Sequence, residues 1–300
     1  MPHNIHIIAG PTASGKSALA LELAAQHDGV IINSDSMQIY DGIPVLTAQP
    51  PAEDLTQAPH EFYSHLHPNE ACSAGNWREM VEPRIHELLA AGKTPLITGG
   101  SGLYINALLY GLSPIPDIPD DIRQAANAKQ KELGNPAFHT ALMARDPVMA
   151  ERLDPFNTAR LIRAWEVLEF SGKSLSEWQA KPKLGPPDNW QFTVHLVIPE
   201  RDVLYDRCNR RLHHMLDMGA LEEIKVLQDR IKNGEVKENA LLTHALGYGH
   251  LSQYIDGQIS KEDAIEKAQN ETRRYAKRQT TWFRNQIKES DNIKSRLVET

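Results

Sequence analysis

A short stretch near the start of the chain has the composition and spacing of a phosphate-binding loop. Gly10, Gly15, Lys16 and Ser17 fit the pattern G-x-x-x-x-G-K-[ST]. Glycines let the backbone wrap an anion with its N–H groups pointing inward, the lysine adds a positive charge, and the serine hydroxyl is a ligand for Mg²⁺. The sequence therefore predicts a site for a phosphorylated ligand. Its residues are Gly10, Pro11, Thr12, Ala13, Ser14, Gly15, Lys16 and Ser17.

A carboxylate follows the second apolar run of the chain. Residues 30–33 have the composition of a buried parallel strand, and Asp35 comes directly after them. Ligands of parallel sheets bind at the carboxyl ends of the strands, where the phosphate loop also opens. Asp35 could cap a turn or helix, or accept a proton in this crevice, and its position favours the second role.

Near the C-terminus, residues 273–288 carry several positive charges and no acidic residue. Arg274, Lys277, Arg278 and Thr281 recur at i, i+3, i+4 and i+7, so a helix places them on one face. Aromatic residues are interleaved with these charges. The face is either simply solvated or a contact surface for the phosphate backbone of RNA.

Strands and helices are expected to alternate around these residues. A strand over 5–9 should precede the phosphate loop, a helix should run from about Ser17 to His27, and Gly29 should end it. A further helix, strand, glycine turn and helix are expected at 77–91, 94–98, 99–102 and 103–110. This order predicts an α/β fold with a P-loop NTPase-like parallel sheet flanked by helices.

Clustered prolines over 112–119 indicate a domain boundary. An inserted all-helical domain is expected over 116–189, and the P-loop α/β core with its C-terminal helices over 1–115 and 190–300. Helices of the insertion are expected at 121–133, 136–145 and 157–171. The core should resume with a strand at 192–198 and helices at 201–218, 221–232 and 262–288.

Bulk composition excludes several protein classes. The formal net charge of −7 argues against a protein that coats nucleic acid nonspecifically, although a local basic surface stays possible. Cys72 and Cys208 are too few and too far apart for a zinc cluster or a disulfide framework, which fits a cytoplasmic protein. No apolar run approaches the roughly 18 residues of a membrane helix, so no membrane partner is expected.

Two further expectations concern metals and assembly. Residues 42–73 show little periodicity apart from a possible short strand, and they are expected to form a long surface excursion. His60, His65 and His67 lie in it without a recognised metal-ligand spacing, so no metal site is expected there. A monomer is expected, because no heptad pattern or long edge strand indicates an interface.

The order of these motifs resembles that of the bacterial tRNA dimethylallyltransferases, also called isopentenyl-tRNA transferases, over nearly the whole chain. Many kinases and ATPases share the phosphate loop, but two segments are highly specific: Asp35-Ser36-Met37-Gln38-Ile39-Tyr40 and Thr272-Arg273-Arg274-Tyr275-Ala276-Lys277-Arg278-Gln279. Further matching segments are Thr47-Ala48-Gln49-Pro50, Gly99-Gly100-Ser101-Gly102-Leu103-Tyr104, Ala159-Arg160-Leu161-Ile162-Arg163, Arg211 with Met215 and Gly219, Gly247-Tyr248 and Trp282-Phe283-Arg284.

The resemblance implies transfer of a dimethylallyl group from dimethylallyl diphosphate to N6 of the adenosine 3′-adjacent to the anticodon in tRNA. Mg²⁺ is the implied cofactor and diphosphate the released product. The implied partner is a tRNA anticodon stem-loop, whose target adenosine must leave its stack. The phosphate loop then holds a leaving group and stabilises its developing charge. Whether ATP also binds the loop stays open.

The resemblance also assigns roles to single residues. Asp35 takes a proton from the adenine amine, and with Thr12, Lys16 and Arg211 it forms the implied catalytic set. Ser17 is the implied Mg²⁺ ligand. The residues implied to hold the base are Ser36, Met37 and Gln38 beside Asp35. Those implied along the RNA path are Ser101, Arg123, Ala159, Arg160, Leu161, Ile162, Arg163, Leu242, Thr243, His244, Ala245, Leu246, Gly247, Arg274, Lys277 and Arg278.

Four positions depart from the family pattern. Leu46 stands where glycine is usual, Gln49 where lysine is usual, Glu61 where a second histidine is frequent, and His244 where arginine is common. Two of these changes remove a positive charge. They are expected to weaken tRNA binding before they affect the reaction.

Two alternative functions stay open at this point. One is another enzyme with the same loop, either a nucleotide kinase or a prenyltransferase that acts on free AMP. The other is an RNA-binding or nucleotide-switch protein without catalytic activity, which a phosphate loop and a basic helix would also permit.

Overall fold

The computed structural model describes residues 2–298, which fold as two compact units. One unit is an insertion, Tyr110–Gly185, and the other combines the chain before and after it. The sequence-based bounds of the insertion, 116–189, lie a few residues away at each end. Among residues 2–298, no helix is both long and apolar enough to cross a bilayer.

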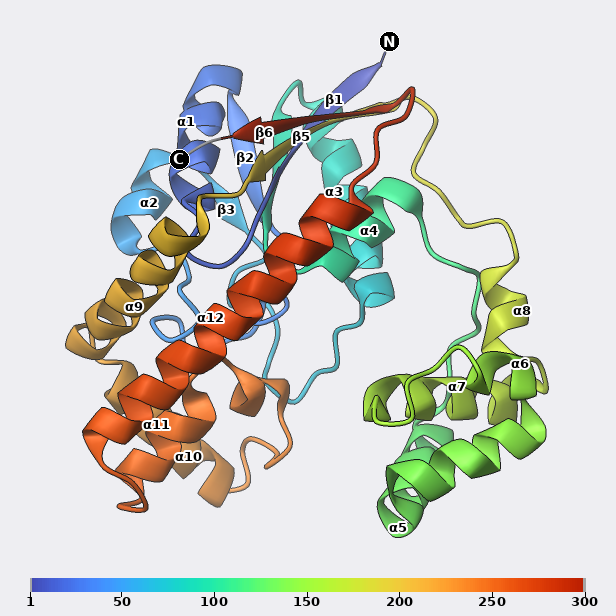
Figure 1. Cartoon of the computed structure of the whole chain (residues 1–300). Coiled ribbons are helices and arrows are strands. Elements are labelled where there is room, and N and C mark those ends of the chain that lie inside the picture. Colours follow the sequence, from blue (N-terminus) through green and yellow to red (C-terminus); the bar gives the residue numbers. More distant parts are fainter. Residues whose placement is uncertain (1, 299–300) are drawn as a thin grey trace. The chain divides into compact units, whose positions relative to one another are not determined.

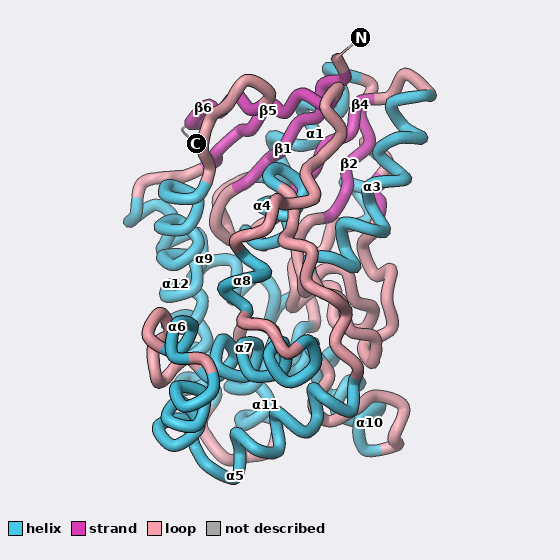
Figure 2. The backbone as a smooth tube through the Cα atoms, turned by 90° about the vertical axis from the view of Figure 1, so that its right-hand side faces the viewer, coloured by secondary structure: helices cyan, strands magenta, loops and turns pink. Residues whose placement is uncertain are grey.

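A six-stranded sheet forms the centre of the larger unit, with the order β3-β2-β4-β1-β5-β6. Figure 2 shows its strands in magenta. Every neighbouring pair is parallel, which confirms the predicted fold class. The strands are β1 (His3–Ala9), β2 (Gly29–Asn33), β3 (His60–Glu61), β4 (Thr94–Gly99), β5 (Trp190–Val197) and β6 (Ile293–Val298).

The edge strand β6 was not expected from sequence, whereas β3 lies in the region 42–73 where a short strand was considered possible. β6 is largely exposed and β3 has only two residues, so neither carries the apolar run of a buried strand. Pairing with β5 and β2, respectively, determines their conformation. The excursion over 42–73 is also more ordered than expected, because it contains α2 (Ala52–Gln57) and the fully buried Ile43.

Helix α1 (Lys16–His27) packs on the sheet through Leu23 and Ala24, against Ile8, Ile31 and Leu96. The helix ends at Asp28, which takes the left-handed conformation with φ 48°. The prediction that Gly29 ends it is therefore wrong. Gly29 begins β2 instead, where a Cβ atom would lie 2.4 Å from Leu96 Cδ1, so only glycine allows this approach.

The remaining helices of this unit are α3 (Ala74–Ala90), α4 (Gly102–Tyr110), α9 (Arg201–Asp217), α10 (Ala220–Lys232), the 3₁₀ helix η1 (Leu241–His244), α11 (Tyr248–Ile255) and α12 (Lys261–Gln286). Helices α9 to α12 pack on one another (Figure 1). Neither η1 nor α11 was expected from sequence. The others begin and end within three residues of their expected bounds.

The smaller unit is helical, with α5 (Asp120–Arg145), α6 (Pro147–Ala150), α7 (Thr158–Ser171) and α8 (Leu175–Gln179) (Figure 1). Gly134 interrupts α5 with φ 70°, between the two helices that the sequence predicted. The smaller unit has its own core, which includes the fully buried Phe138, Leu142 and Leu161. An apolar core of its own is what makes this segment a separate unit.

Two histidines on neighbouring strands are buried inside the sheet. His6 Nδ1 and His195 Nε2 are 3.0 Å apart, and Arg296 Nε donates to His195 Nδ1 at 2.9 Å. Because His195 Nδ1 accepts, a neutral His195 carries its proton on Nε2 and donates it to His6. Burial, together with the charges of Arg296 and His27, lowers the pKa of both histidines to about 4.

This histidine pair predicts acid sensitivity. Between pH 6.5 and about 4 the unfolded chain binds protons at these positions while the folded chain does not, so stability should fall as the pH decreases. The loss should be on the order of 3 kcal/mol for one such group. Urea unfolding at a series of pH values measures it. If the free energy of unfolding decreased with falling pH as steeply in His195→Gln as in the natural protein, the histidine pair would not be the cause of the acid sensitivity.

Candidate active site

The phosphate loop leaves the end of β1 and enters α1. Gly10 allows the loop to pass the neighbouring strand, because a Cβ atom there would lie 2.2 Å from the Val197 carbonyl oxygen. Ala13 and Gly15 take left-handed conformations, with φ 62° and 96°, which curve the backbone. Lys16 Nζ donates to the Pro11 carbonyl at 2.6 Å. The loop therefore has the curved backbone and the internal cation expected from its sequence.

Helix α9 adds two cations to this loop. Arg211 donates to the Thr12 hydroxyl, and Arg207, one turn earlier, donates to the Ser14 carbonyl at 3.2 Å. The resemblance identified Arg211 but not Arg207, although the i, i+4 spacing places both on one face of the helix. Burial lowers the pKa of Lys16 to about 8, with nearby Asp35 raising it and Arg211 lowering it. Burial also lowers the pKa of Arg211.

Asp35 shapes a turn and also lies in the wall of a cavity. Its Oδ1 accepts from the Met37 N–H at 2.9 Å, and Asn33 Oδ1 accepts from the Asp35 N–H at 2.8 Å, so it does shape a turn. The Ser36 N–H donates to Ser101 Oγ at 2.8 Å, which ties this turn to the end of β4. The Asp35 carboxylate nevertheless lines the two cavities described below, where it can contact a ligand.

Gln279 of α12 connects the phosphate loop to the glycine turn after β4. Its Oε1 accepts from the Thr12 N–H at 2.8 Å, and its Nε2 donates to the Gly100 carbonyl at 2.9 Å. A Cβ atom on residue 100 would lie 2.4 Å from Gln279 Nε2, so a side chain there would displace the Gln279 amide from this bridge. Gln279 belongs to a segment that carries the resemblance, but the sequence gave no indication of this bridging role.

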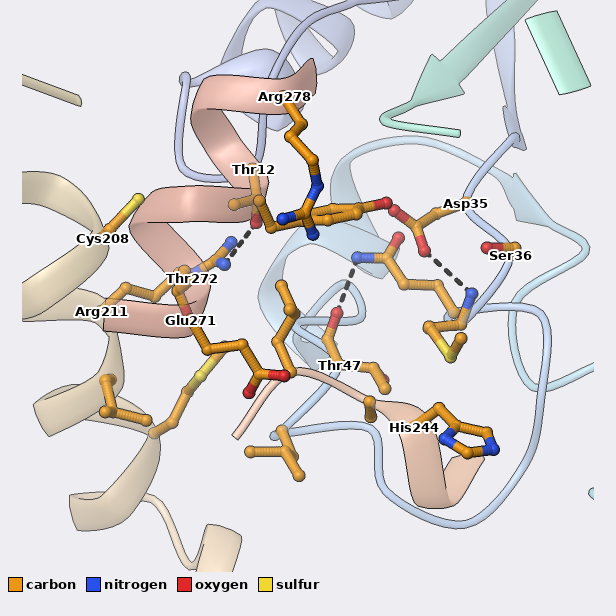
Figure 3. A pocket seen from close by; sticks show the side chains of 18 residues that line it. Thr12, Asp35, Ser36, Thr47, Cys208, Arg211, His244, Glu271, Thr272 and Arg278 are labelled. Carbon is orange, nitrogen blue, oxygen red and sulfur yellow. Dashed lines mark hydrogen bonds between the residues drawn. The ribbon is translucent and has the colours of Figure 1, made fainter. Parts of the chain in front are cut away.

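Two adjoining cavities meet at these side chains. One, of about 340 Å³, is lined by the phosphate loop, Arg207, Thr98 and Gln279. The other, of about 260 Å³, is lined by Ser36, Met37, the η1 segment and α12 (Figure 3). Both include Thr12, Asp35, Gln38 and Arg211 in their walls. Asp35 and the cations of the loop therefore face a common space.

The second cavity has an apolar part. Leu46, Leu212, Met215 and Leu246 contribute to its walls, and Arg211 lies on the same helix one turn before Met215. A ligand could thus place a phosphate group beside Arg211 and a hydrocarbon group among these side chains.

A divalent cation fits the first cavity only as a partner of ligand phosphates. Among residues 2–298, no three His, Cys, Asp or Glu side chains converge as a metal site, which includes the loop histidines. Ser17 is exposed at the start of α1, and Thr98 Oγ1 in the cavity wall is buried without a hydrogen-bond partner in the described chain. Hydroxyl oxygens of this kind suit Mg²⁺, which is usually bound through few protein ligands and substrate phosphates.

The basic face of α12 has the predicted arrangement. Arg274, Lys277, Arg278 and Thr281 are exposed, while Thr272, Ala276, Gln279 and Phe283 are buried on the opposite side of the helix. The exposed residues line a shallow groove of about 560 Å³ together with Trp282. Arg278 also reaches the wall of the second cavity.

Other residues of the predicted RNA path lie in different places. Ser101 contacts Ser36 at the site, and His244, Ala245 and Leu246 line the second cavity. Thr243 and Gly247 flank that segment, and Gly247 donates to Glu271 at 2.9 Å. Arg123 and residues 159–163 belong to the separate helical unit, with Ala159 and Arg160 exposed.

Two of these predictions need correction. Leu161 and Leu242 are fully buried, so their side chains present no surface to RNA. They belong to the interiors of their respective units. Their match to the resemblance therefore reflects packing that supports neighbouring exposed residues.

Comparison with known proteins identifies the family. The model of the family described as IPP transferase matches residues 38–286. This chain belongs to that family. It is 44% identical to a tRNA dimethylallyltransferase of Paramagnetospirillum magneticum, over 98% of this chain and 92% of that protein. A tRNA dimethylallyltransferase of Rhodospirillum centenum is 43% identical, over 94% and 88% of the two chains.

Solved structures of relatives support the same family assignment. The tRNA isopentenylpyrophosphate transferase of Bacillus halodurans matches with a TM-score of 0.67 and 33% identity, covering 100% of this chain and 91% of that one. A eukaryotic dimethylallyltransferase acting on tRNA matches with a TM-score of 0.81 and 26% identity, covering 99% and 74%. The sequence-based assignment to this family is confirmed.

The pKa of Lys16 predicts how anion binding depends on pH. With a pKa of about 8, Lys16 is charged at pH 7 and mostly neutral at pH 9. Affinity for inorganic diphosphate should therefore fall by about tenfold over this interval relative to Lys16→Met, which has no titrating group there. Calorimetry on both proteins measures this, and the ionisation of the ligand itself cancels in the comparison. Parallel pH profiles would contradict the prediction.

Proposed function

We propose that this protein transfers a dimethylallyl group from dimethylallyl diphosphate to N6 of the adenosine 3′-adjacent to the anticodon in tRNA. The observation that carries this proposal is the position of Asp35. Its carboxylate lies in the wall of both cavities, with the cationic phosphate loop on one side and the basic face of α12 on the other. The named relatives are tRNA dimethylallyltransferases, and this geometry suits their reaction.

The phosphate loop would hold the donor through its leaving group. As the bond between the allylic carbon and the diphosphate oxygen breaks, negative charge grows on the diphosphate. The loop N–H groups, Lys16, Arg207 and Arg211 are arranged to stabilise that charge. The hydrocarbon part of the donor would lie among Leu46, Leu212, Met215 and Leu246.

Asp35 would act on the incoming adenine. The exocyclic nitrogen forms the new bond to the allylic carbon, and Asp35 accepts the proton that this nitrogen loses. Because this amine is a weak nucleophile, its orientation matters as much as its basicity. Ser36, Met37 and Gln38 line the same cavity and would hold the flipped base.

Mg²⁺ is the cofactor we propose, held by the Ser17 hydroxyl and the phosphates of the donor. When bound, it neutralises charge on the departing diphosphate. We also propose that the exposed Arg274, Lys277 and Arg278 contact RNA phosphates, as do Arg160 and Arg163 of the helical unit. A monomer in the cytoplasm fits a tRNA substrate and the free thiols of Cys72 and Cys208.

A transfer assay tests the proposal. The protein is incubated with Mg²⁺, dimethylallyl diphosphate, ATP and either unmodified tRNA or AMP, and the products are analysed by mass spectrometry. Prenylated adenosine in the tRNA is the expected result. Prenylated AMP alone would instead identify an enzyme of free nucleotides. ATP consumption without prenyl transfer would identify a kinase, and no product in any arm would refute the proposal.

Asp35→Ala should separate catalysis from binding. Loss of a general base should lower the transfer rate by roughly two to four decades. Binding of tRNA should persist, because the basic face of α12 is unchanged. Rates under single-turnover conditions and a filter-binding assay measure the two quantities, with exposed Asp291→Ala as control. An unchanged rate in Asp35→Ala would contradict the role of Asp35.

A further inference from the structure

A glutamate outside the proposed catalytic set binds the backbone of the cavity wall. Glu223 lies in the first turn of α10, and its carboxylate accepts from the Val45 N–H at 2.9 Å and the Leu46 N–H at 3.0 Å. The contact joins segments 178 and 177 residues apart in sequence. Two hydrogen bonds from one carboxylate fix both the position and the direction of the segment that donates them.

The segment that Glu223 binds is a compact turn. The Thr47 N–H donates to the Ile43 carbonyl and the Ala48 N–H to the Val45 carbonyl, both at 3.0 Å. Ile43 is fully buried and anchors its start. Ala48 has a left-handed backbone with φ 57°, a conformation that an alanine keeps only when its surroundings hold it. We call residues 43–49 the wall turn.

The wall turn contributes to the site in two ways. Leu46 and Thr47 line the second cavity, with Leu46 beside its apolar part. The carbonyls of Thr47 and Ala48 accept from Gln38 Nε2 at 2.9 and 2.8 Å, and Gln38 lines both cavities together with Asp35. A displacement of the wall turn would therefore move Leu46 in the apolar part of the cavity and also break the hydrogen bonds that hold Gln38.

We propose that Glu223 is a positioning residue for the transfer reaction, acting through the wall turn on Leu46 and Gln38. This inference rests on the proposed function. Through Leu46, Glu223 limits the size of the hydrocarbon group that the cavity accepts, and through Gln38 it orients the base beside Asp35. Glu223 itself does not line either cavity.

The structure also suggests why removal of Glu223 would act on the reaction more than on folding. The carboxylate is only partly buried, so water could satisfy the two N–H groups that it leaves. What water cannot replace is the fixed direction of the wall turn. A displacement of about 1 Å in a reaction site can lower a rate by up to about a hundredfold.

The experiment compares Glu223→Ala, Glu223→Gln and Glu222→Ala with the natural protein. Glu222 is the exposed neighbour on the same helix and serves as the matched control. Transfer to tRNA is measured with dimethylallyl diphosphate and with geranyl diphosphate, which carries a hydrocarbon group twice as long. Thermal unfolding and tRNA binding are measured in parallel.

We expect Glu223→Ala to lower kcat/KM for dimethylallyl diphosphate by about ten- to a hundredfold. Its preference for dimethylallyl over geranyl diphosphate should fall by about tenfold, which is about 1.4 kcal/mol. Glu223→Gln should lie between, because its amide oxygen can accept one of the two N–H groups. Glu222→Ala should match the natural protein. Leu46→Ala should relax the donor preference in the same direction, with every backbone hydrogen bond intact.

Two results would overturn the inference. One is a Glu223→Ala protein whose kcat/KM and donor preference stay within about twofold of the natural values. The other is a loss of activity that follows the unfolded fraction while the donor preference is unchanged, because that would be a purely structural role. If the natural protein transfers no prenyl group to tRNA, the proposed function itself fails, a result that differs from both.

Discussion

Three cationic side chains gather around one glycine-rich loop, and the larger unit is organised around holding them. Lys16 donates to the Pro11 carbonyl, Arg207 to the Ser14 carbonyl, and Arg211 to the Thr12 hydroxyl. These neutral acceptors offset only part of the repulsion and of the lost hydration, as the lowered pKa of Lys16 shows. The diphosphate of the proposed donor would supply the negative charge that offsets the remaining repulsion.

Helix α12 contacts the phosphate loop with its buried side and carries the proposed RNA-binding face on its exposed side. Its buried face carries Gln279, which joins the phosphate loop to the turn after β4. Its exposed face carries Arg274 and Lys277. Because a helix repeats every 3.6 residues, one element can hold both groups in a fixed relation. The proposed donor site and RNA surface are thus linked through a single rigid element.

Several segments of the cavity walls are held by hydrogen bonds between side chains and backbone groups outside regular secondary structure. Glu223 binds the N–H groups of Val45 and Leu46, and Gln38 binds the carbonyls of Thr47 and Ala48. Asn33 holds the backbone of Asp35 in the same way. In each case a backbone group without a partner in regular structure is satisfied by a side chain. The loop segments of the cavity walls therefore keep their shape beside α9 and α12, which form the rest of those walls.

The sequence alone determined the features that depend on local spacing. The phosphate loop, the strand before Asp35, the helical insertion and the exposed face of α12 follow from glycine placement and apolar periodicity, which act within a few residues. The position of Asp35 was predicted for the same reason, because it directly follows a strand that the apolar run 30–33 indicates. The family assignment came from the order of these motifs and the segments that match it.

Only the tertiary structure decided what joins residues far apart in the chain. The contacts of Arg207, Gln279 and Glu223 have no signal in the sequence, because their partners lie more than 170 residues away. The edge strand β6 lacks apolar alternation and exists because β5 offers it a partner. Leu161 and Leu242 match the family segments, but burial shows that they pack inside their units. Pairing between segments far apart in the chain leaves no local pattern in sequence, which is why these features required the fold.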